Sequence, residues 1–153
     1  MSIEQTHTAL EQLLTGPSGL VDVDEYNKLE LKLLSIDHDS ATNSVTLEHC
    51  LMDTLYIRTM HAKAGTIIVG ATCKVDSTVH VTKGALVVWY PEQESSVAAE
   101  GDYIVSPAGT RRIGYVLEDC TWVNVYAKQG QTVEENEDNL FVDSKLLINR
   151  RNK

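Results

Sequence analysis

Residues 101–127, GDYIVSPAGTRRIGYVLEDCTWVNVYA, decide the fold class of this chain of 153 residues. They contain short runs rich in Val, Ile, Thr and Tyr, separated by turn-forming Gly, Pro and Asp, which is the pattern of strands joined by tight turns. The same texture begins at Leu55, and the runs that carry it are residues 55–60, 66–69, 78–82, 85–90, 103–106, 112–117 and 121–127. No helical period separates them, so the sequence predicts an all-β antiparallel sandwich or barrel.

The last of these runs has two different faces. Trp122, Asn124 and Tyr126 alternate with small or β-branched residues and therefore share one side of the strand. Large aromatic residues with an amide suit the interior of a small barrel, but they equally suit a contact with a neighbouring subunit. The alternation alone leaves both alternatives open.

The segment before the strands predicts one helix and one undecided region. Residues 2–14 form an amphipathic helix with Ser2 as its N-cap, ended by Gly16-Pro17. This helix packs against the flank of the domain or docks on another subunit. Residues 29–36 alternate like a strand but equally suit the start of a helix, and residues 37–40 read as a turn.

The segment after the strands reads as an extension. Residues 134–138, EENED, predict a solvated acidic turn, and the basic end at residues 150–153 predicts a frayed terminus. We therefore divide the chain into an N-terminal helix and acidic peripheral segment (1–47), a barrel (48–130) and a C-terminal extension (131–153).

Charge and composition exclude several classes of function. The formal net charge is −9, and residues 1–60 hold ten acids against three bases. This argues against binding to duplex DNA or to an anionic membrane, since both require a basic surface. No apolar run approaches the roughly 20 residues of a membrane span, and the N-terminus lacks the features of a signal peptide. Three cysteines without a C-x-x-C motif predict reduced thiols in a cytosolic protein.

The spacing of glycines in the strand region resembles the first motif of the cupin superfamily, G-x5-H-x-H-x3-4-E-x6-G. Gly65 and Gly84 frame the segment, and the positions of the metal ligands fall on Ala71, Cys73 and Ser77. The resemblance therefore keeps the turn glycines but not the histidines and glutamate that hold the family's metal.

The second cupin motif, G-x5-P-x-G-x2-H-x3-N, is matched in the same way. Gly101, Pro107 and Gly109 keep its frame, whereas Arg112 replaces the histidine and Val116 replaces the asparagine. The resemblance implies a double-stranded β-helix, that is, a jelly-roll barrel.

The chain is more similar still to cupin-like proteins encoded by bacteriophages. The matching stretches, in order, are residues 55–58 (LYIR), 64–70 (AGTIIVG), 107–112 (PAGTRR) and 118–126 (EDCTWVNVY). The likeness spans about residues 48–140. It implies a phage protein located in the host cytoplasm of an infected bacterium or in the virion.

A bound metal is not expected. Among the ligand positions only Cys73 keeps a donor side chain, and a catalytic metal needs three or four convergent ligands. Asp76 is predicted to lie in a turn, and His80 on the strand face opposite to Ser77. His38, His49 and His61 fall in turn-like or strand-start contexts and are expected at the surface. We expect no cofactor and no catalytic residue, since no nucleophile elbow, zinc-protease motif or P-loop occurs either.

Arg112 is the most specific polar feature that remains. If it points into the lumen as the family's histidine does, its charge meets an anion or a carboxylate. One alternative is an ion pair, within the chain or between subunits, with an acid such as Glu118 or Glu100. The other is a lumen site for a small anionic ligand such as a nucleotide, sugar phosphate or carboxylate, with candidate residues Cys73, Ser77, Arg112, Trp122 and Tyr126.

Three functions follow from these observations. The leading hypothesis is a non-enzymatic, metal-free cupin-fold phage protein that acts through contacts with itself, as a homo-oligomer, and with other virion proteins. The alternative is a binding module for a small anionic ligand in the lumen. The third hypothesis is a residual metal-dependent cupin enzyme.

Overall fold

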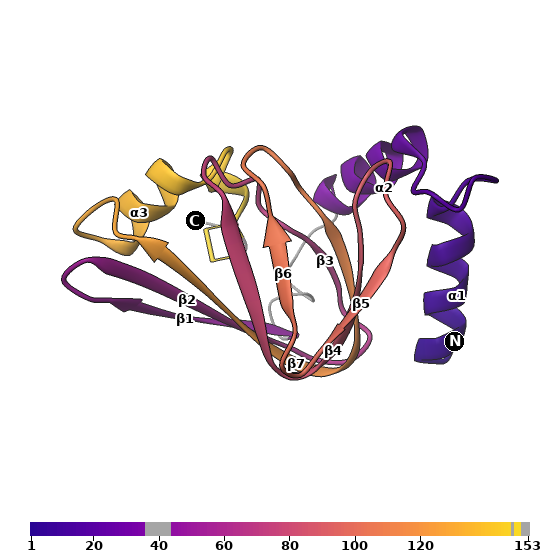
Figure 1. Cartoon of the computed structure of the whole chain (residues 1–153), viewed down its shortest axis with the longest axis horizontal. Helices are drawn as coiled ribbons and strands as arrows, with labels where there is room; N and C mark the ends of the chain where they lie inside the picture. Colours follow the sequence, from indigo (N-terminus) through magenta and orange to yellow (C-terminus); the bar gives the residue numbers. More distant parts are fainter. Residues whose placement is uncertain (36–43, 148, 151–153) are drawn as a thin grey trace.

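A computed structural model describes residues 1–35, 44–147, 149 and 150 of the chain (Figure 1). Along the sequence the elements are α1 (Ile3–Leu14), α2 (Val23–Ser35), β1 (Val45–Leu51), β2 (Leu55–Ala62), β3 (Ile67–Val69), β4 (Ser77–Trp89), β5 (Ser96–Ala99), β6 (Tyr103–Ser106), β7 (Ile113–Ala127), α3 (Val133–Leu140) and the 3-10 turn η1 (Ser144–Leu146). The predicted turn at residues 37–40, with His38, lies outside the described residues.

The strands form an antiparallel, cupin-like jelly-roll barrel, as the sequence predicts. They hydrogen-bond in the order β1-β2-β7-β4-β5, with β3 added on β7 and β6 added on β4. Residues 45–51 and 96–99 also form strands, which the sequence patterns did not single out. The all-β fold class is therefore confirmed, with β1 and β5 added to the predicted set.

The two central strands are longer than predicted. Residues 78–82 and 85–90 were expected as separate strands, as were 112–117 and 121–127, but each pair forms one long strand, β4 and β7. The register between them shifts at several points from Val81 to Leu86, and these bulges bend the strands so that one pair serves two walls of the barrel. Gly84 has φ +78°, and a Cβ there would collide with the Asp119 carbonyl oxygen.

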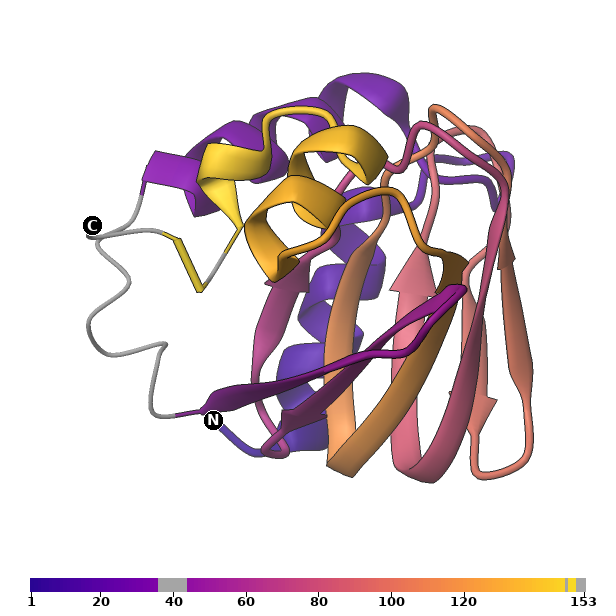
Figure 2. The ribbon, with the colours of Figure 1, turned by 90° about the vertical axis from the view of Figure 1, so that its left-hand side faces the viewer.

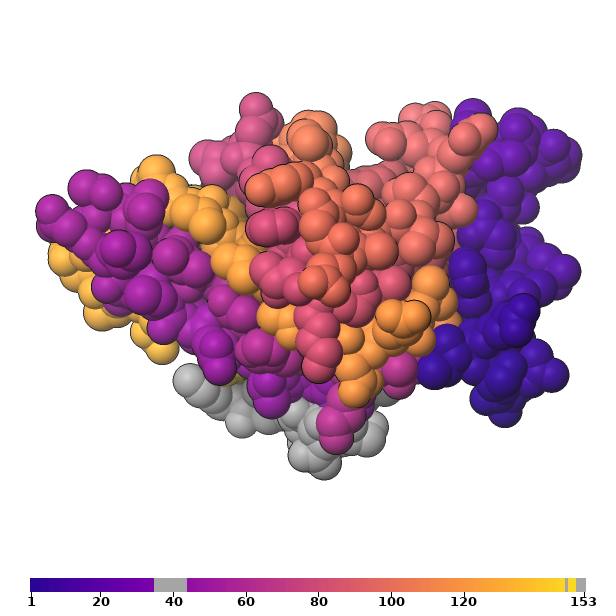
Figure 3. Space-filling model, turned by 60° about the horizontal axis from the view of Figure 1, so that its bottom comes forward, coloured from indigo at the N-terminus to yellow at the C-terminus, as the bar shows by residue number. Residues whose placement is uncertain are grey.

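The N-terminal helices pack on the flank of the barrel, which confirms one of the two roles predicted for the first helix. Ser2 caps α1 in a full capping box with Gln5. The Trp89 indole N–H donates to the Glu11 carboxylate of α1 at 2.7 Å. The predicted ambiguity at residues 29–36 is resolved as helix through Ser35, in α2. Figure 3 shows this N-terminal part (indigo) at one end of the molecule, beside the strands.

The C-terminal extension closes one end of the barrel. Figure 2 shows α3 and η1 (yellow) over the upper rim of the strands, and Figure 1 shows α3 at the end of the molecule opposite to α1. The acidic stretch 134–138 is not the expected solvated turn, because it lies in α3, capped by the Thr132 hydroxyl, and Glu137 is fully buried there. Arg150 is not frayed, since its guanidinium contacts the carboxylates of Glu137 at 3.1 Å and Asp138 at 2.5 Å. Residues 151–153 lie outside the described residues.

The buried apolar residues form three clusters in different parts of the domain. One lies inside the barrel around Trp122 and Met60, and a second lies between the barrel wall and helices α1 and α2. The third caps the closed end and contains Tyr56, Tyr126 and Phe141. None of the described helices is both long and apolar enough to cross a membrane.

Candidate functional site

A cavity of about 230 Å³ lies inside the barrel, between the inner cluster and the cap. All five candidate residues line it, namely Cys73, Ser77, Arg112, Trp122 and Tyr126. Trp122, Asn124 and Tyr126 therefore face the lumen, so the barrel interior is the correct alternative for this face of β7. Ser77 faces the cavity, whereas His80 points away and stacks on Tyr103, as predicted for opposite faces of one strand.

Polar side chains encircle the middle of the cavity and form what we call the polar belt: Arg58, Ser77, Ser106, Arg112 and Asn124. Strand register brings them together, because Arg58 on β2 pairs with Asn124 on β7, and Ser77 on β4 pairs with Ser106 on β6. Val79 and Ile104 of the inner apolar cluster lie level with Asn124 and Arg58, whereas Met60 and Trp122 lie two residues further along their strands. A ligand in this cavity can therefore contact the belt and apolar side chains together.

Arg112 is held inside the barrel by neutral oxygens. Its guanidinium donates to the Tyr90 hydroxyl at 3.2 Å and to the Ser106 hydroxyl. Within the described ranges it forms no ion pair, so the pairing with Glu118 or Glu100 of the same chain is not present. The acid partner belongs to its neighbour instead, because Arg111 contacts Glu30 of α2 at 2.6 Å.

Arg58 is the second cation in the belt, and it is more buried than Arg112. Its side chain is only 7% exposed, its Nε has no hydrogen-bond partner, and its Cζ lies 5.5 Å from the centre of the Phe141 ring. In the part of the chain that is described, no carboxylate forms an ion pair with it. A cation over an aromatic face gains some stabilisation, but less than an ion pair with hydrogen bonds provides.

Tyr126 supplies a neutral hydroxyl close to both arginines. Burial raises the pKa of Tyr126 well above its ordinary value, against the opposing charges of Arg58 and Arg112. Its ring stacks on Tyr56 and meets Phe141 edge to face. The phenol is therefore a fixed hydrogen-bonding group over the working range of pH and carries no negative charge that would neutralise the belt.

His49 and His61 do not line the cavity, and each contacts a hydroxyl on the neighbouring strand. His49 Nδ1 lies 2.7 Å from the Tyr56 hydroxyl, and burial followed by the charge of Arg58 lowers the pKa of His49. His61 was expected in a turn, but it lies in β2, and its Nδ1 is 2.9 Å from the Thr121 hydroxyl on β7. Neither residue adds a ligand to the lumen.

The donor set of the cavity does not fit a metal cation. Guanidinium, hydroxyl and amide groups make up the belt, and Cys73 is the only thiol on the described lining. Asp143 also lines the cavity but is exposed at its rim. In residues 1–35, 44–147, 149 and 150, no group of three His, Cys, Asp or Glu side chains is placed to hold a metal ion. The two arginines favour the opposite charge, an anion.

Sequence reasoning missed part of this site. Arg58 was quoted only as part of a matching stretch, although it shares a strand face with Tyr56 and Met60, and that alternation is a readable signal. Ser106 and Tyr90 carried no signal, because their role depends on long-range pairing with Arg112.

Comparisons with known proteins support the fold alone. No model of a known protein family matches the sequence, and no curated protein matches it. The structure is similar to the DMSP lyase DddQ from Ruegeria pomeroyi, with a TM-score of 0.53 and 9% identity over 65% of this chain and 54% of that chain. Ectoine synthase from P. lautus gives a TM-score of 0.50 and 14% identity over 60% and 67%.

Structures described as cupins are also among the similar ones. A cupin-2 domain protein from Shewanella frigidimarina aligns with a TM-score of 0.46 and 13% identity, over 64% of this chain and 99% of that chain. The strand order, the bent central strands and the likeness to the DMSP lyase and the ectoine synthase together give the chain a cupin-like jelly-roll fold.

Proposed function

We propose that this chain is a binding module that holds a small anionic ligand in the lumen of its barrel. One observation carries the proposal: Arg58 and Arg112 both line the cavity, and neither forms an ion pair within the described residues. Arg58 is buried and Arg112 is partly buried, and a charge removed from water without an ion partner is costly. An anion in the cavity beside these guanidinium groups offsets that cost. Ser77, Ser106, Asn124 and Tyr126 supply neutral hydrogen bonds around it.

A thermal-shift screen of the full chain tests this function. The panel contains acetate, phosphate, glucose 6-phosphate and AMP, and a true ligand at 100 times its Kd stabilises the fold by about 2.7 kcal/mol. Arg112→Gln is expected to abolish the shift. Lys63→Gln, the same loss of charge at an exposed position that does not line the cavity, is expected to keep it. If no anion raises the Tm, the proposal is wrong.

The outer face of the sheet favours a second function, assembly with another copy of this chain. Val105 and Tyr103 of β6 are 66% and 65% exposed, and Val125 of β7 is 49% exposed. Strand pairing continues the face through Ile57, which lies opposite Val125. Apolar side chains that share one outer face are typical of a protein–protein interface. Light scattering tests this role: a strict monomer at high micromolar concentration contradicts it, and Val105→Asp is expected to weaken the oligomer.

The phage origin and a place in the virion are proposals that rest on the sequence resemblance alone. They predict that the chain copurifies with phage particles and with other virion proteins. Mass spectrometry of purified particles checks this, and its absence from them would limit the chain to the infected cell.

A further inference from the structure

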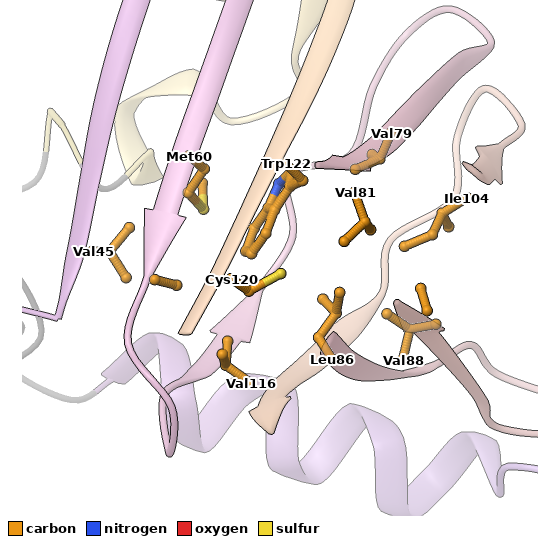
Figure 4. Packing of buried hydrophobic residues seen from close by; sticks show 12 residues of the cluster. Val45, Met60, Val79, Val81, Leu86, Val88, Ile104, Val116, Cys120 and Trp122 are labelled. Carbon is orange, nitrogen blue, oxygen red and sulfur yellow. The ribbon is translucent and has the colours of Figure 1, made fainter. Parts of the chain in front are cut away.

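The lumen is amphipathic, because part of its apolar lining lies beyond the polar belt. Beyond the polar belt the cavity is lined by a set of side chains that we call the floor: Met60, Leu86, Val88 and Trp122. Figure 4 shows them converging from β2, β4 and β7. Among these four, Trp122 alone carries an N–H or O–H group, its indole N–H.

The floor selects against ligands that are polar along their whole length. A sugar phosphate or a nucleotide brings hydroxyls or ring nitrogens as well as its anionic group. Once the anion occupies the belt, those groups lie against Leu86 and Val88, which offer no hydrogen bond, and burying an unpaired polar group is unfavourable. A hydrocarbon part in the same place gains from leaving water.

The packing of the cap gives a ligand's hydrocarbon part room only on the floor side of the belt. On the other side of the belt, Phe141 and Tyr126 pack against each other and against Leu140 and Leu147 in the buried cap cluster. The cavity of about 230 Å³ is smaller than the roughly 300–1,000 Å³ of pockets for drug-sized ligands, which restricts the ligand to a short chain or a single ring.

We propose that the ligand is a small amphiphilic carboxylic acid, with its carboxylate in the polar belt and its hydrocarbon part on the floor. This inference rests on the anion-binding function proposed above and narrows it, because it removes sugar phosphates and nucleotides from the candidate ligands. Arg112 and Arg58 suit the head group, since a guanidinium pairs with a carboxylate through two parallel hydrogen bonds.

Calorimetric titration of the full chain with a series of linear acids tests the inference. Acetate, butanoate and hexanoate share one head group, so the affinity is expected to rise about fourfold for each added methylene until the floor is filled. Hexan-1-ol, which has the tail without the charge, and glucose 6-phosphate, which has a charge without the tail, are both expected to bind at least tenfold more weakly than hexanoate.

A matched pair of variants separates the floor from the general packing of the barrel. Val88 lines the cavity and Val87 does not, although they are neighbours on β4 and each is 1% exposed. Val88→Thr is expected to reduce the ratio of hexanoate to acetate affinity at least threefold, whereas Val87→Thr is expected to leave it unchanged. If Val88→Thr fails to fold, the chain-length series on the wild-type protein decides alone.

The outcomes distinguish this inference from the function on which it rests. Equal affinity for acetate and hexanoate, or tightest binding of glucose 6-phosphate, overturns the amphiphilic ligand and keeps the anion site. No binding of any anion overturns both. If the affinity of Arg112→Gln still rises with chain length as in the wild type, the hydrocarbon part binds outside this site. That result also overturns the inference.

Discussion

The guanidinium of Arg112 donates to the Tyr90 hydroxyl at 3.2 Å, so a neutral oxygen and not a carboxylate contacts this partly buried cation. Arg150, at the edge of the cap and also partly buried, shows the contrast. Its guanidinium lies 3.1 Å from the fully buried carboxylate of Glu137. Arg150 therefore has an acid partner within the fold, whereas Arg112 forms no ion pair among the described residues.

Arg150 and Arg58 are expected to differ in what removal of their charge costs. Arg150→Met takes away the ion pair of the buried Glu137, and we expect it to lower the free energy of unfolding by about 3 kcal/mol at neutral pH. Arg58 forms no ion pair among the described residues, although its charge also favours the ionised Glu137, so we expect Arg58→Met to lower the free energy of unfolding by only about 1 kcal/mol. Urea denaturation measures both.

An exposed pair supplies the control for this comparison. Lys28 contacts Glu25 at 3.1 Å on the surface of α2, and Lys28→Met is expected to change stability by less than about 1 kcal/mol. A loss of several kcal/mol in Arg58→Met would mean that Arg58 is a structural residue, and would remove half of the proposed anion site.

The attachment of α1 is expected to weaken in acid. Partial burial disfavours the Glu11 carboxylate, but hydrogen bonds from Ser95, Trp89 and Thr15 outweigh it and lower the pKa of Glu11 below its ordinary value of 4.5. A lowered folded pKa contributes stability that is present above the unfolded pKa and lost as pH falls through the folded pKa.

Thermal melts of the wild type and of Glu11→Gln from about pH 7 to about pH 3 measure this contribution. The wild type is expected to be the more stable protein at the upper end, and the gap is expected to narrow as the acid side is approached. A gap that stays constant over this range would show that the charge of Glu11 plays no part.

The bend of β4 depends on one glycine. Gly84 and Gly101 both have positive φ, +78° and +93°, but an added Cβ collides with backbone only at Gly84 and has nothing within 4 Å at Gly101. We expect Gly101→Ala to lower the free energy of unfolding by about 1 kcal/mol, because alanine is disfavoured at positive φ even without a clash. Gly84→Ala is expected to cost about 3 kcal/mol or more. Equal losses would contradict the clash.

The three thiols are expected to react at different rates. Cys50 is exposed, whereas Cys73 and Cys120 are buried, and burial raises the pKa of Cys120 to about 11. Because the thiolate is the reactive form, iodoacetamide is expected to modify Cys50 first in the native protein and all three after unfolding. Peptide mass spectrometry reads the order, and early modification of Cys120 would contradict the packing of the inner cluster.

Local patterns predicted most of the barrel and one side of its lumen. Alternation along 121–126 placed Trp122 and Tyr126 on one face, and the turn glycines and Pro107 framed the strands. The prediction failed where turn-forming residues occur within a strand and do not end it. Gly84 and the Glu118-Asp119 pair resemble turns in the sequence. The pairing of β4 with β7 nevertheless continues on both sides of them, because β-bulges let the paired strands bend.

The other failures have a common physical cause, which is long-range pairing. The stretch 134–138 has no apolar period that would mark a helix, but Thr132 caps it and Arg150 neutralises its buried Glu137. The sequence also could not predict that Arg112 forms no ion pair, because strand register decides which acid lies near it.

Titration of hexanoate into the wild-type chain and into Arg112→Gln in the same calorimeter tests whether the lumen arginines form an anion site. We expect one binding site per chain in the wild type and at least a tenfold loss of affinity in the variant, with an unchanged urea midpoint to show that the barrel is intact. Equal binding by the two proteins, or none by the wild type, would contradict the anion site.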